Sequence, residues 1–244
     1  MSSNIDIDIG SLIDLSHRLN SNALVYPGDP VFTCRPFASI ETDGYSVQAI
    51  SMGSHTGTHV DAPSHFFTEG KTIDQIPLST FVGHGLVIDL ASKGPRQKIV
   101  WDDLAAYAGQ MKEHVMLYTG WSKHWCTYYE HPFLDRDAAE RIIAHGIRVL
   151  GVDTLNPDET CLDGTMGDGG FGVHEVILGA EGIVAENLTN LNALIGQDVM
   201  VSLILMGATG HLLGCSLGGQ DEVFPSQGLG HWRQFTHISR LHVL

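Results

Sequence analysis

The chain has 244 residues, 43% of them hydrophobic, and this length and composition are typical of a soluble globular protein with a substantial core. It carries 28 acidic and 13 basic residues, which gives a formal net charge of −15. Nucleic acids and anionic membranes bind basic surfaces, so this charge argues against both as partners. No run of about 18 apolar residues predicts a membrane span.

The cysteines and the first residues favour a cytoplasmic protein. The four cysteines form no C-x-x-C pair, which is typical of free thiols in a reducing compartment. The sequence begins M-S-S-N-I-D-I-D-I-G, which is acidic and lacks the basic region of a secretory signal. We therefore expect a cytoplasmic location.

The first fifty residues predict two strands separated by a sharp turn. A short strand is expected around Leu12–Leu15, and P-G-D-P at 27–30 is a strong turn signal. Tyr26 precedes that turn and could belong to the core or form an aromatic wall beside a pocket. Residues 45–54 alternate in polarity and predict a strand that leads into the next segment.

That next segment, H-T-G-T-H-V-D-A-P-S-H at 55–65, carries the ligand types of a metal site: His55, His59, Asp61 and His65. Imidazole nitrogens and a carboxylate suit zinc, and manganese or iron could use them too. One such histidine alone would more often be structural. Three with an aspartate over so short a distance favour a metal site.

The metal-site interpretation requires the segment to bend. On an extended strand rising roughly 3.3 Å per residue, the Cα atoms of His55 and His59 would lie about 13 Å apart, too far for one ion. Gly57 and Pro63 disfavour a helix. We therefore expect a turn at Gly57, with Pro63 holding Ala62 extended.

The rest of the chain alternates between buried strands and helices, which predicts a single α/β domain with a mixed sheet. A Gly-rich stretch at 160–175 is read as a flexible loop, and it lacks the strand–turn–helix context of a nucleotide site. Residues after Met206 are weakly patterned. The expected strands are 85–90, 114–121, 148–154 and 199–205, with helices at 100–111 and 136–145 and a strand leading into a short helix at 181–188.

The 55–65 segment resembles the H-x-G-T-H-x-D-x-P-x-H signature of the cyclase-like metal-dependent hydrolases, a family that includes bacterial-type kynurenine formamidase and isatin hydrolase. Further matches are D-L-S-H-R-L (14–19), Y-P-G-D (26–29), T-G-W (119–121) and G-V-D-T (151–154). The resemblance covers roughly residues 12–205. It implies the swivelling β/β/α fold, assembled as homodimers or homotetramers.

The resemblance also implies roles for individual residues. His55, His59 and Asp61 correspond to metal ligands, and His65 corresponds to the proton donor and acceptor. A histidine followed twelve residues later by a glutamate, His174 and Glu186, matches the pair that completes a second metal position bridged by Asp61 and Glu186. The implied cofactor is one or two divalent ions, Zn²⁺ or Mn²⁺.

Several positions depart from the family pattern. Tyr26 replaces a substrate-contacting tryptophan, so it is the candidate substrate-binding residue and the kynurenine pocket is in doubt. Asn156 replaces the serine of D-T-x-S-x-D. The end of the chain lacks the D-G-S-P-x-R segment of the family. We therefore expect residues 1–205 to form the hydrolase domain and 206–244 to be a divergent C-terminal segment of the same domain. Within that segment, residues from about 216 are expected to be a divergent or aberrantly spliced tail.

This residue set predicts a metal-dependent hydrolase of an amide, lactam or lactone. A divalent ion can acidify water and polarise a carbonyl, and an imidazole suits the proton transfers. Tyr26, Trp121 and Trp125 suggest an aromatic small-molecule substrate. The alternative is a non-hydrolytic cyclase or isomerase, or a ligand-binding protein of secondary metabolism.

Overall fold

The computed structural model describes residues 12–20, 23, 25–124, 128–161, 169–203, 206–208, 211–213 and 242–243. Within this part of the chain the fold is built on one mixed sheet of eight strands. Its spatial order is β1 (Ile13–Asp14), β14 (His242–Val243), β11 (Val199–Ser202), β5 (Val82–Asp89), β7 (His114–Tyr118), β9 (Val149–Val152), β10 (Ile183–Glu186) and β4 (His59–Asp61).

The centre of the sheet is parallel and its margins are antiparallel. Strands β5, β7, β9 and β10 run parallel, with Leu86 opposite Val115 and Val115 opposite Leu150. Strand β11 pairs antiparallel with β5, and β4 pairs antiparallel with β10 at the far margin. Buried parallel strands need apolar residues on both faces, and β7 and β9 are buried along their whole length.

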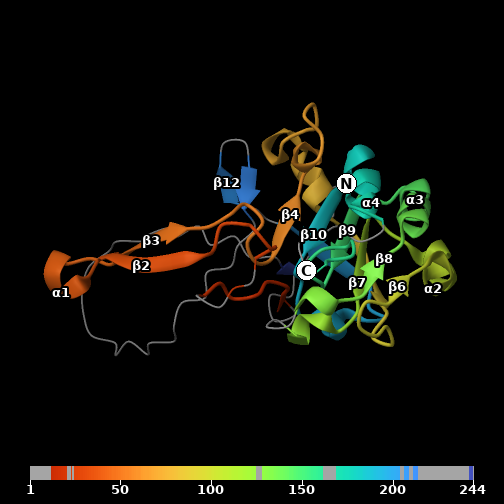
Figure 1. The fold of residues 1–244 in the computed structure, drawn as a ribbon, viewed down its shortest axis with the longest axis horizontal. Helices are drawn as coiled ribbons and strands as arrows, with labels where there is room; N and C mark the ends of the chain where they lie inside the picture. Colours follow the sequence, from red (N-terminus) through yellow and green to blue (C-terminus); the bar gives the residue numbers. More distant parts are fainter. Residues whose placement is uncertain are drawn as a thin grey trace, which may run out of the picture.

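Successive residues of the central strands enter two different cores. Val115 and Leu117 pack on one face with the helices α3 (Arg136–Ala144) and α4 (Gly172–Gly179), whereas Met116 and Tyr118 pack on the other. Figure 1 shows α2 (Trp101–Leu104), α3 and α4 together on one side of the sheet. The expected α/β fold with a mixed sheet is confirmed.

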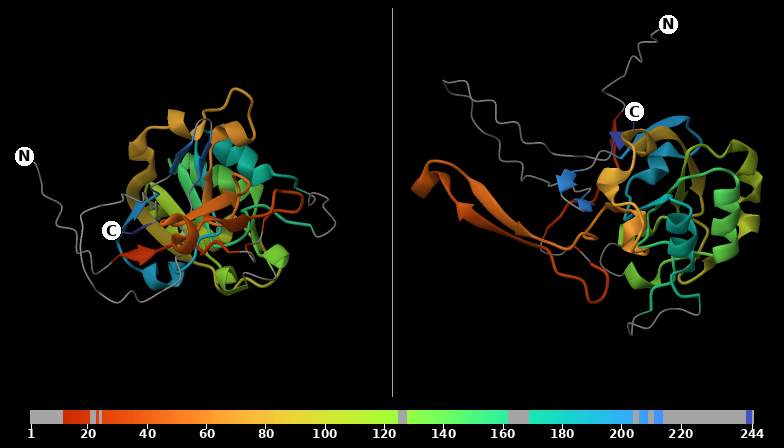
Figure 2. Two further views of the ribbon diagram at one scale, coloured as in Figure 1. Left: turned by 90° about the vertical axis from the view of Figure 1, so that its left-hand side faces the viewer. Right: turned by 90° about the horizontal axis from the view of Figure 1, so that it is seen from above.

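A two-stranded arm projects from this body (Figures 1 and 2). It consists of β2 (Thr33–Ala38), the short helix α1 (Ile40–Asp43) and β3 (Val47–Ser51), which pairs antiparallel with β2. Its apolar side chains remain exposed: Phe37 is 75% exposed and Ile40 60%. The strand expected at 45–54 is therefore present, but it belongs to the arm and not to the main sheet.

Most of the predicted elements are present, with two corrections. The strand expected at 181–188 is β10, but no helix follows it within that range. The second correction concerns the Gly-rich stretch. Residues 172–175, read as part of a flexible loop, are the start of α4. The helix expected at 100–111 is α2 followed by 3-10 turns. The other short elements are β6 (Lys98–Ile99) with β8 (Phe133–Leu134), β12 (Met206–Ala208) with β13 (His211–Leu213), and the 3-10 turns η2 (Pro63–His65), η3 (Ile73–Gln75), η4 (Leu78–Phe81), η5 (Ala105–Gln110), η6 (Trp121–His124), η7 (Tyr128–Glu130) and η8 (Leu191–Leu194).

Strands β12, β13 and β14 lie in the segment that the sequence leaves weakly patterned, and β14 enters the main sheet between β1 and β11. The remaining residues of the expected divergent C-terminal segment, 209–210, 214–241 and 244, lie outside the described residues. None of the helices in the described part of the chain has the length and apolarity to cross a bilayer.

Candidate active site

The site begins with the pairing of β4 and β10 at the sheet margin. Glu186 lies directly opposite His59, and Val184 lies opposite Asp61. Residues opposite each other in an antiparallel pair project from the same face. Val184 packs in the core beneath α3 and α4, so His59, Asp61 and Glu186 project toward the helical face as well. All three are buried, with exposures of 1%, 1% and 5%.

The turn predicted at Gly57 brings the preceding histidine to the same place. Gly57 has φ of 70°, and the carbonyl of Gly57 accepts hydrogen bonds from His59 Nδ1 at 2.8 Å and Asn187 Nδ2 at 3.0 Å. The imidazole rings of His55 and His59 are consequently 5.0 Å apart, centroid to centroid. Ala62 is extended as expected, with φ −97° and ψ 161°.

Helix α4 supplies His174 from above the sheet. Its Nε2 lies 3.1 Å from Glu186 Oε1 and 3.3 Å from Asp61 Oδ2. The other ring nitrogen, Nδ1, lies 2.6 Å from Asp158 Oδ2, and Asp158 also accepts hydrogen bonds from the backbone N–H groups of Val173 and His174. Asp158 therefore caps the start of α4 and fixes which nitrogen of His174 faces the two carboxylates.

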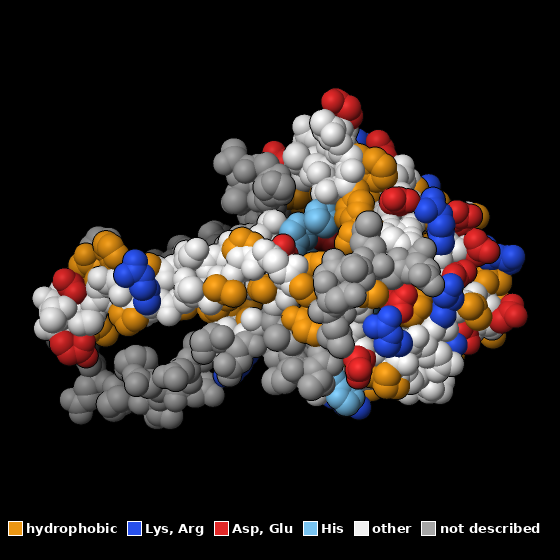
Figure 3. Space-filling view, in the orientation of Figure 1, with side chains coloured by type: hydrophobic (Ala, Val, Ile, Leu, Met, Phe, Trp, Pro, Cys, Tyr) orange, Lys and Arg blue, Asp and Glu red, His pale blue; other side chains and the backbone are white. Residues whose placement is uncertain are grey.

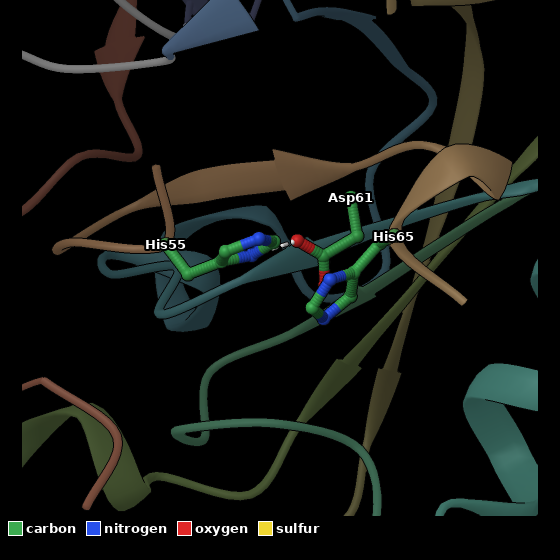
Figure 4. Close-up of side chains that lie close together, drawn as sticks. All are labelled: His55, Asp61 and His65. Carbon is green, nitrogen blue, oxygen red and sulfur yellow. Dashed lines mark ion pairs between the residues drawn. The ribbon is translucent and has the colours of Figure 1, made fainter. Parts of the chain in front are cut away.

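The second half of the site consists of His55, Asp61 and His65 (Figure 4). His55 Nδ1 lies 2.6 Å from Asp61 Oδ1, and the rings of His55 and His65 are 4.0 Å apart. The potential ligand atoms of these three residues lie within 4.8 Å of one another, and the same holds for His59, Asp61 and Glu186. Asp61 belongs to both groups, which is the position expected of a bridging carboxylate.

The structure thus brings together all six residues expected from the sequence. Their separate roles as ligand or proton carrier stay predictions, because His65 lies within the same distance of Asp61 as the expected ligands do. The members of the group are His55, His59, Asp61, His65, His174 and Glu186.

The two buried carboxylates create a strong demand for positive charge. Burial alone would lower the pKa of His59, but Asp61 and Glu186 raise it to about 9. Burial likewise opposes protonation of His174, yet Asp158, Asp61 and Glu186 hold its pKa well above the ordinary value. Burial and the Asp61 charge raise the pKa of Glu186, whereas His59 holds that of Asp61 low despite burial.

A divalent cation fits this demand. His59 donates through Nδ1 to a carbonyl, so Nε2 is the nitrogen that faces the carboxylates, and it would bind an ion once that ion replaced its proton. It lies 3.3 Å from carboxylate oxygens of both Asp61 and Glu186, yet among the described residues it forms no hydrogen bond of acceptable geometry. Two carboxylates and an imidazole nitrogen that face one another in a buried space favour a positive charge between them, which a bound cation would supply. The residues present therefore fit a metal ion.

A cavity of about 210 Å³ opens above these groups. Figure 3 shows histidine side chains in the hollow between the base of the arm and the body. One wall is aromatic: Phe66 stacks on His174 with ring centroids 4.9 Å apart, and Phe171 lies 6.2 Å from Tyr26. Tyr26 lines the cavity, as the pocket alternative for this residue requires.

The aromatic wall differs from the one expected. Trp121 is 9% exposed, its ring lies 4.8 Å from that of His124, and it is not among the residues that line the cavity. Trp125 lies outside the described residues. Phe66 and Phe171 take the place expected for tryptophan, and sequence reasoning missed both because an isolated phenylalanine has no distinguishing pattern.

Asp158 was also missed as a site residue, although a signal was available. It is the last residue of the D-T-x-N-x-D pattern, and the residue is 4% exposed. The first aspartate of the pattern, Asp153, accepts hydrogen bonds from the backbone N–H groups of Thr119 and Gly120. The pattern therefore ties both the T-G-W turn and α4 to the end of β9.

Sequence comparison gives relatives for this chain. The model of the family described as putative cyclase matches residues 13–159. Kynurenine formamidase of Geobacillus thermodenitrificans is 34% identical over 148 residues, which cover 60% of this chain and 69% of that protein. Kynurenine formamidase of Maricaulis maris is 32% identical over 147 residues, covering 59% and 69%.

Solved structures share the fold. Isatin hydrolase A from Labrenzia aggregata, bound to benzyl benzoate, superposes with a TM-score of 0.71 at 24% identity, over 83% of this chain and 90% of that one. An isatin hydrolase bound to the product analogue thioisatinate gives 0.75 at 17% identity, over 96% and 92%. With a family model that matches more than half of its length and with these relatives, the chain belongs to the putative cyclase family.

Proposed function

We propose that this protein is a metal-dependent hydrolase that cleaves the C–N bond of an amide or lactam, or the C–O bond of a lactone, in a small aromatic substrate. The observation that carries this function is the group of four imidazoles and two carboxylates on the floor of an aromatic cavity, with His59 Nε2 left without a hydrogen bond among the described residues. The curated relatives, named kynurenine formamidases, support an amide as the scissile bond.

The chain's own residues would hold a divalent ion, Zn²⁺ or Mn²⁺, at His59, Asp61 and Glu186, with His174 and His55 completing one or two positions. Such an ion supplies Lewis acidity, which polarises a carbonyl and makes water acidic near neutral pH. Four of these five residues, all except His59, also line the cavity, so this chemistry would act on a bound substrate.

His65 is the proposed proton carrier. Its ring lies at the cavity edge beside His55 and His174, and partial burial together with these neighbours lowers its pKa while Asp61 opposes the shift. A neutral imidazole at pH 7 can accept a proton from the attacking water and return it to the leaving nitrogen or oxygen. That proton balance leaves an acid and an amine, or an acid and an alcohol.

Tyr26, Phe66 and Phe171 would orient an aromatic substrate. Their rings form the wall facing the charged floor, and the cavity of about 210 Å³ suits a bicyclic ring or a single aryl group. The partner is thus a small molecule. Assembly into homodimers or homotetramers stays a prediction, which light scattering on the purified protein would test.

The test of this function is a substrate screen after metal removal and reloading. Protein stripped with a chelator and reloaded with Zn²⁺ or Mn²⁺ is assayed against N-formylkynurenine, isatin and a simple lactone, alongside elemental analysis. We expect hydrolysis that is lost on stripping and restored on reloading. Equal turnover by the stripped and reloaded protein, or turnover of none of the three, would contradict the proposal.

A further inference from the structure

A buried chain of hydrogen bonds runs from the start of β8 to the cavity wall. His131 Nδ1 lies 2.7 Å from the carbonyl oxygen of Pro132, and His131 Nε2 lies 2.9 Å from Thr160 Oγ1. Thr160 Oγ1 lies 2.7 Å from the side-chain amide of Asn156. All three side chains are 4% exposed or less, and Asn156 also lines the cavity.

The direction of every hydrogen bond in this chain follows from its first member. A carbonyl oxygen can only accept, so His131 Nδ1 carries a proton and donates to Pro132. Burial lowers the pKa of His131 to about 4, so the ring is neutral and its Nε2 accepts. Thr160 must therefore donate its hydroxyl proton to His131, which leaves the Thr160 oxygen to accept from Asn156.

This sequence of donors and acceptors settles which way the Asn156 amide faces. The atom directed at Thr160 has to be the NH₂ group, because the Thr160 proton is already committed to His131. The remaining polar atom, Asn156 Oδ1, has no hydrogen-bond partner in the part of the chain that the structure describes. A buried carbonyl left without a donor costs free energy, which a ligand that supplies a donor would recover.

We propose that Asn156 Oδ1 accepts a hydrogen bond from the substrate's N–H, so that the site selects secondary amides and N–H lactams over N-alkylated amides and lactones. Asn156 is thus a specificity-determining residue, and His131 and Thr160 are positioning residues that fix Oδ1 as the unengaged acceptor of its amide. The inference rests on the proposed hydrolase function. It extends that function, because neither the metal ligands nor the aromatic wall distinguishes an N–H substrate from one without it.

The test uses two lactams that differ in this proton alone, isatin and N-methylisatin, with the full-length, metal-loaded protein. We expect kcat/KM and the calorimetric dissociation constant to favour isatin by about tenfold or more. In Asn156→Leu, which keeps the size of the side chain but removes the acceptor, the preference falls to near one. If N-methylisatin were disfavoured because of its bulk, the preference would persist in this variant.

Two further variants separate the acceptor from a general structural effect. Thr160→Val removes the hydroxyl that orients the amide, and it should reduce the isatin preference partly while Asn156 is intact. Asn192→Leu, an exposed position on η8, is the matched control and should keep the full preference. A fold disturbed by substitution would weaken both lactams together and leave their ratio unchanged.

Failure of this inference and failure of the hydrolase function are distinguishable. If the protein hydrolyses neither lactam, the ratio of their dissociation constants still reports on Asn156. If the wild type and Asn156→Leu prefer isatin over N-methylisatin equally, the inference is overturned even when hydrolysis is fast. It is also overturned if neither lactam binds. A preference that Asn156→Leu abolishes supports it.

Discussion

The β4–β10 margin of the sheet and the β2–β3 arm are both antiparallel pairs, yet they place opposite kinds of side chain inside and outside. At the margin, His59 and Asp61 are 1% exposed, whereas Phe37 and Ile40 of the arm are 75% and 60% exposed. Burying an uncompensated charge destabilises the folded state, and apolar side chains that stay exposed contribute no hydrophobic stabilisation. The β4–β10 margin therefore favours a bound cation, which would balance its buried carboxylates. The arm, in contrast, contributes little to the stability of the body.

The largest expected effect is at the margin. Asp61→Asn removes the charge shared by both groups of potential ligands, so metal content and hydrolytic activity should be lost together. Elemental analysis and the substrate screen measure the two losses, and circular dichroism checks the fold. Unchanged metal content in a folded Asp61→Asn protein would show that the buried carboxylate is not a ligand.

His65→Ala should separate catalysis from metal binding. Removing a general acid–base group slows turnover by about 10²–10⁴-fold, while the deeper ligands still hold the metal. The comparison is between kcat and metal content in the same preparation. Loss of metal along with activity would instead assign His65 to the ligand group with His55 and Asp61.

Buried histidines make the body sensitive to acid. The folded-state pKa of His131 is about 4, below the ordinary 6.5, so the unfolded chain binds more protons between these values. The contribution of His131 to the free energy of unfolding is fully present above about pH 6.5 and is lost as the pH falls toward 4. At 1.36 kcal/mol per pKa unit, this loss is roughly 3 kcal/mol. Urea unfolding across that range measures the slope.

His131→Gln keeps a donor and an acceptor but cannot titrate in this window, so the slope should decrease. His84→Gln, at an exposed histidine 3.5 Å from Asp198, is the control and should keep the wild-type slope. An unchanged slope in His131→Gln would mean that the ring is protonated in the folded protein.

Asp158→Asn should weaken metal binding without dismantling the sheet. The variant keeps the size of the side chain but loses the charge that holds His174 Nδ1 at 2.6 Å. Partners of this kind change metal affinity by about 10–100-fold. Competition with a chelating dye gives the affinity, and Asp29→Asn, which lines the cavity outside the ligand group, serves as the charge-matched control. Equal affinities in both variants would deny Asp158 a positioning role.

The smallest effect is expected in the arm. Phe37→Ser with Ile40→Ser should change the free energy of unfolding by no more than about 0.5 kcal/mol, whereas Leu150→Ala in the core costs about 2–5 kcal/mol. A large, concentration-dependent loss in the arm variant would mean that a second copy of the chain covers these side chains.

Sequence alone predicted the parts of the molecule in which local chemistry decides the structure. Gly57 forced the turn, and the apolar run at 85–90 became a central strand, because backbone freedom and burial act over a few residues. The start of α4 was missed because two glycines at 169 and 170 precede it, a third at 172 begins it, and the distant Asp158 caps it. The sequence also could not predict a role for Asn156 in substrate binding, because the orientation of its side-chain amide depends on His131, twenty-five residues away in sequence.

Gly57 has a consequence for engineering this protein. Its φ of 70° excludes most side chains, and a Cβ at this position would collide with Leu19. A mutant library aimed at new substrates therefore gains nothing from varying position 57. Substitutions belong at Tyr26 and Phe171, where new side chains alter the aromatic wall of the cavity and leave the ligand-bearing turn unchanged.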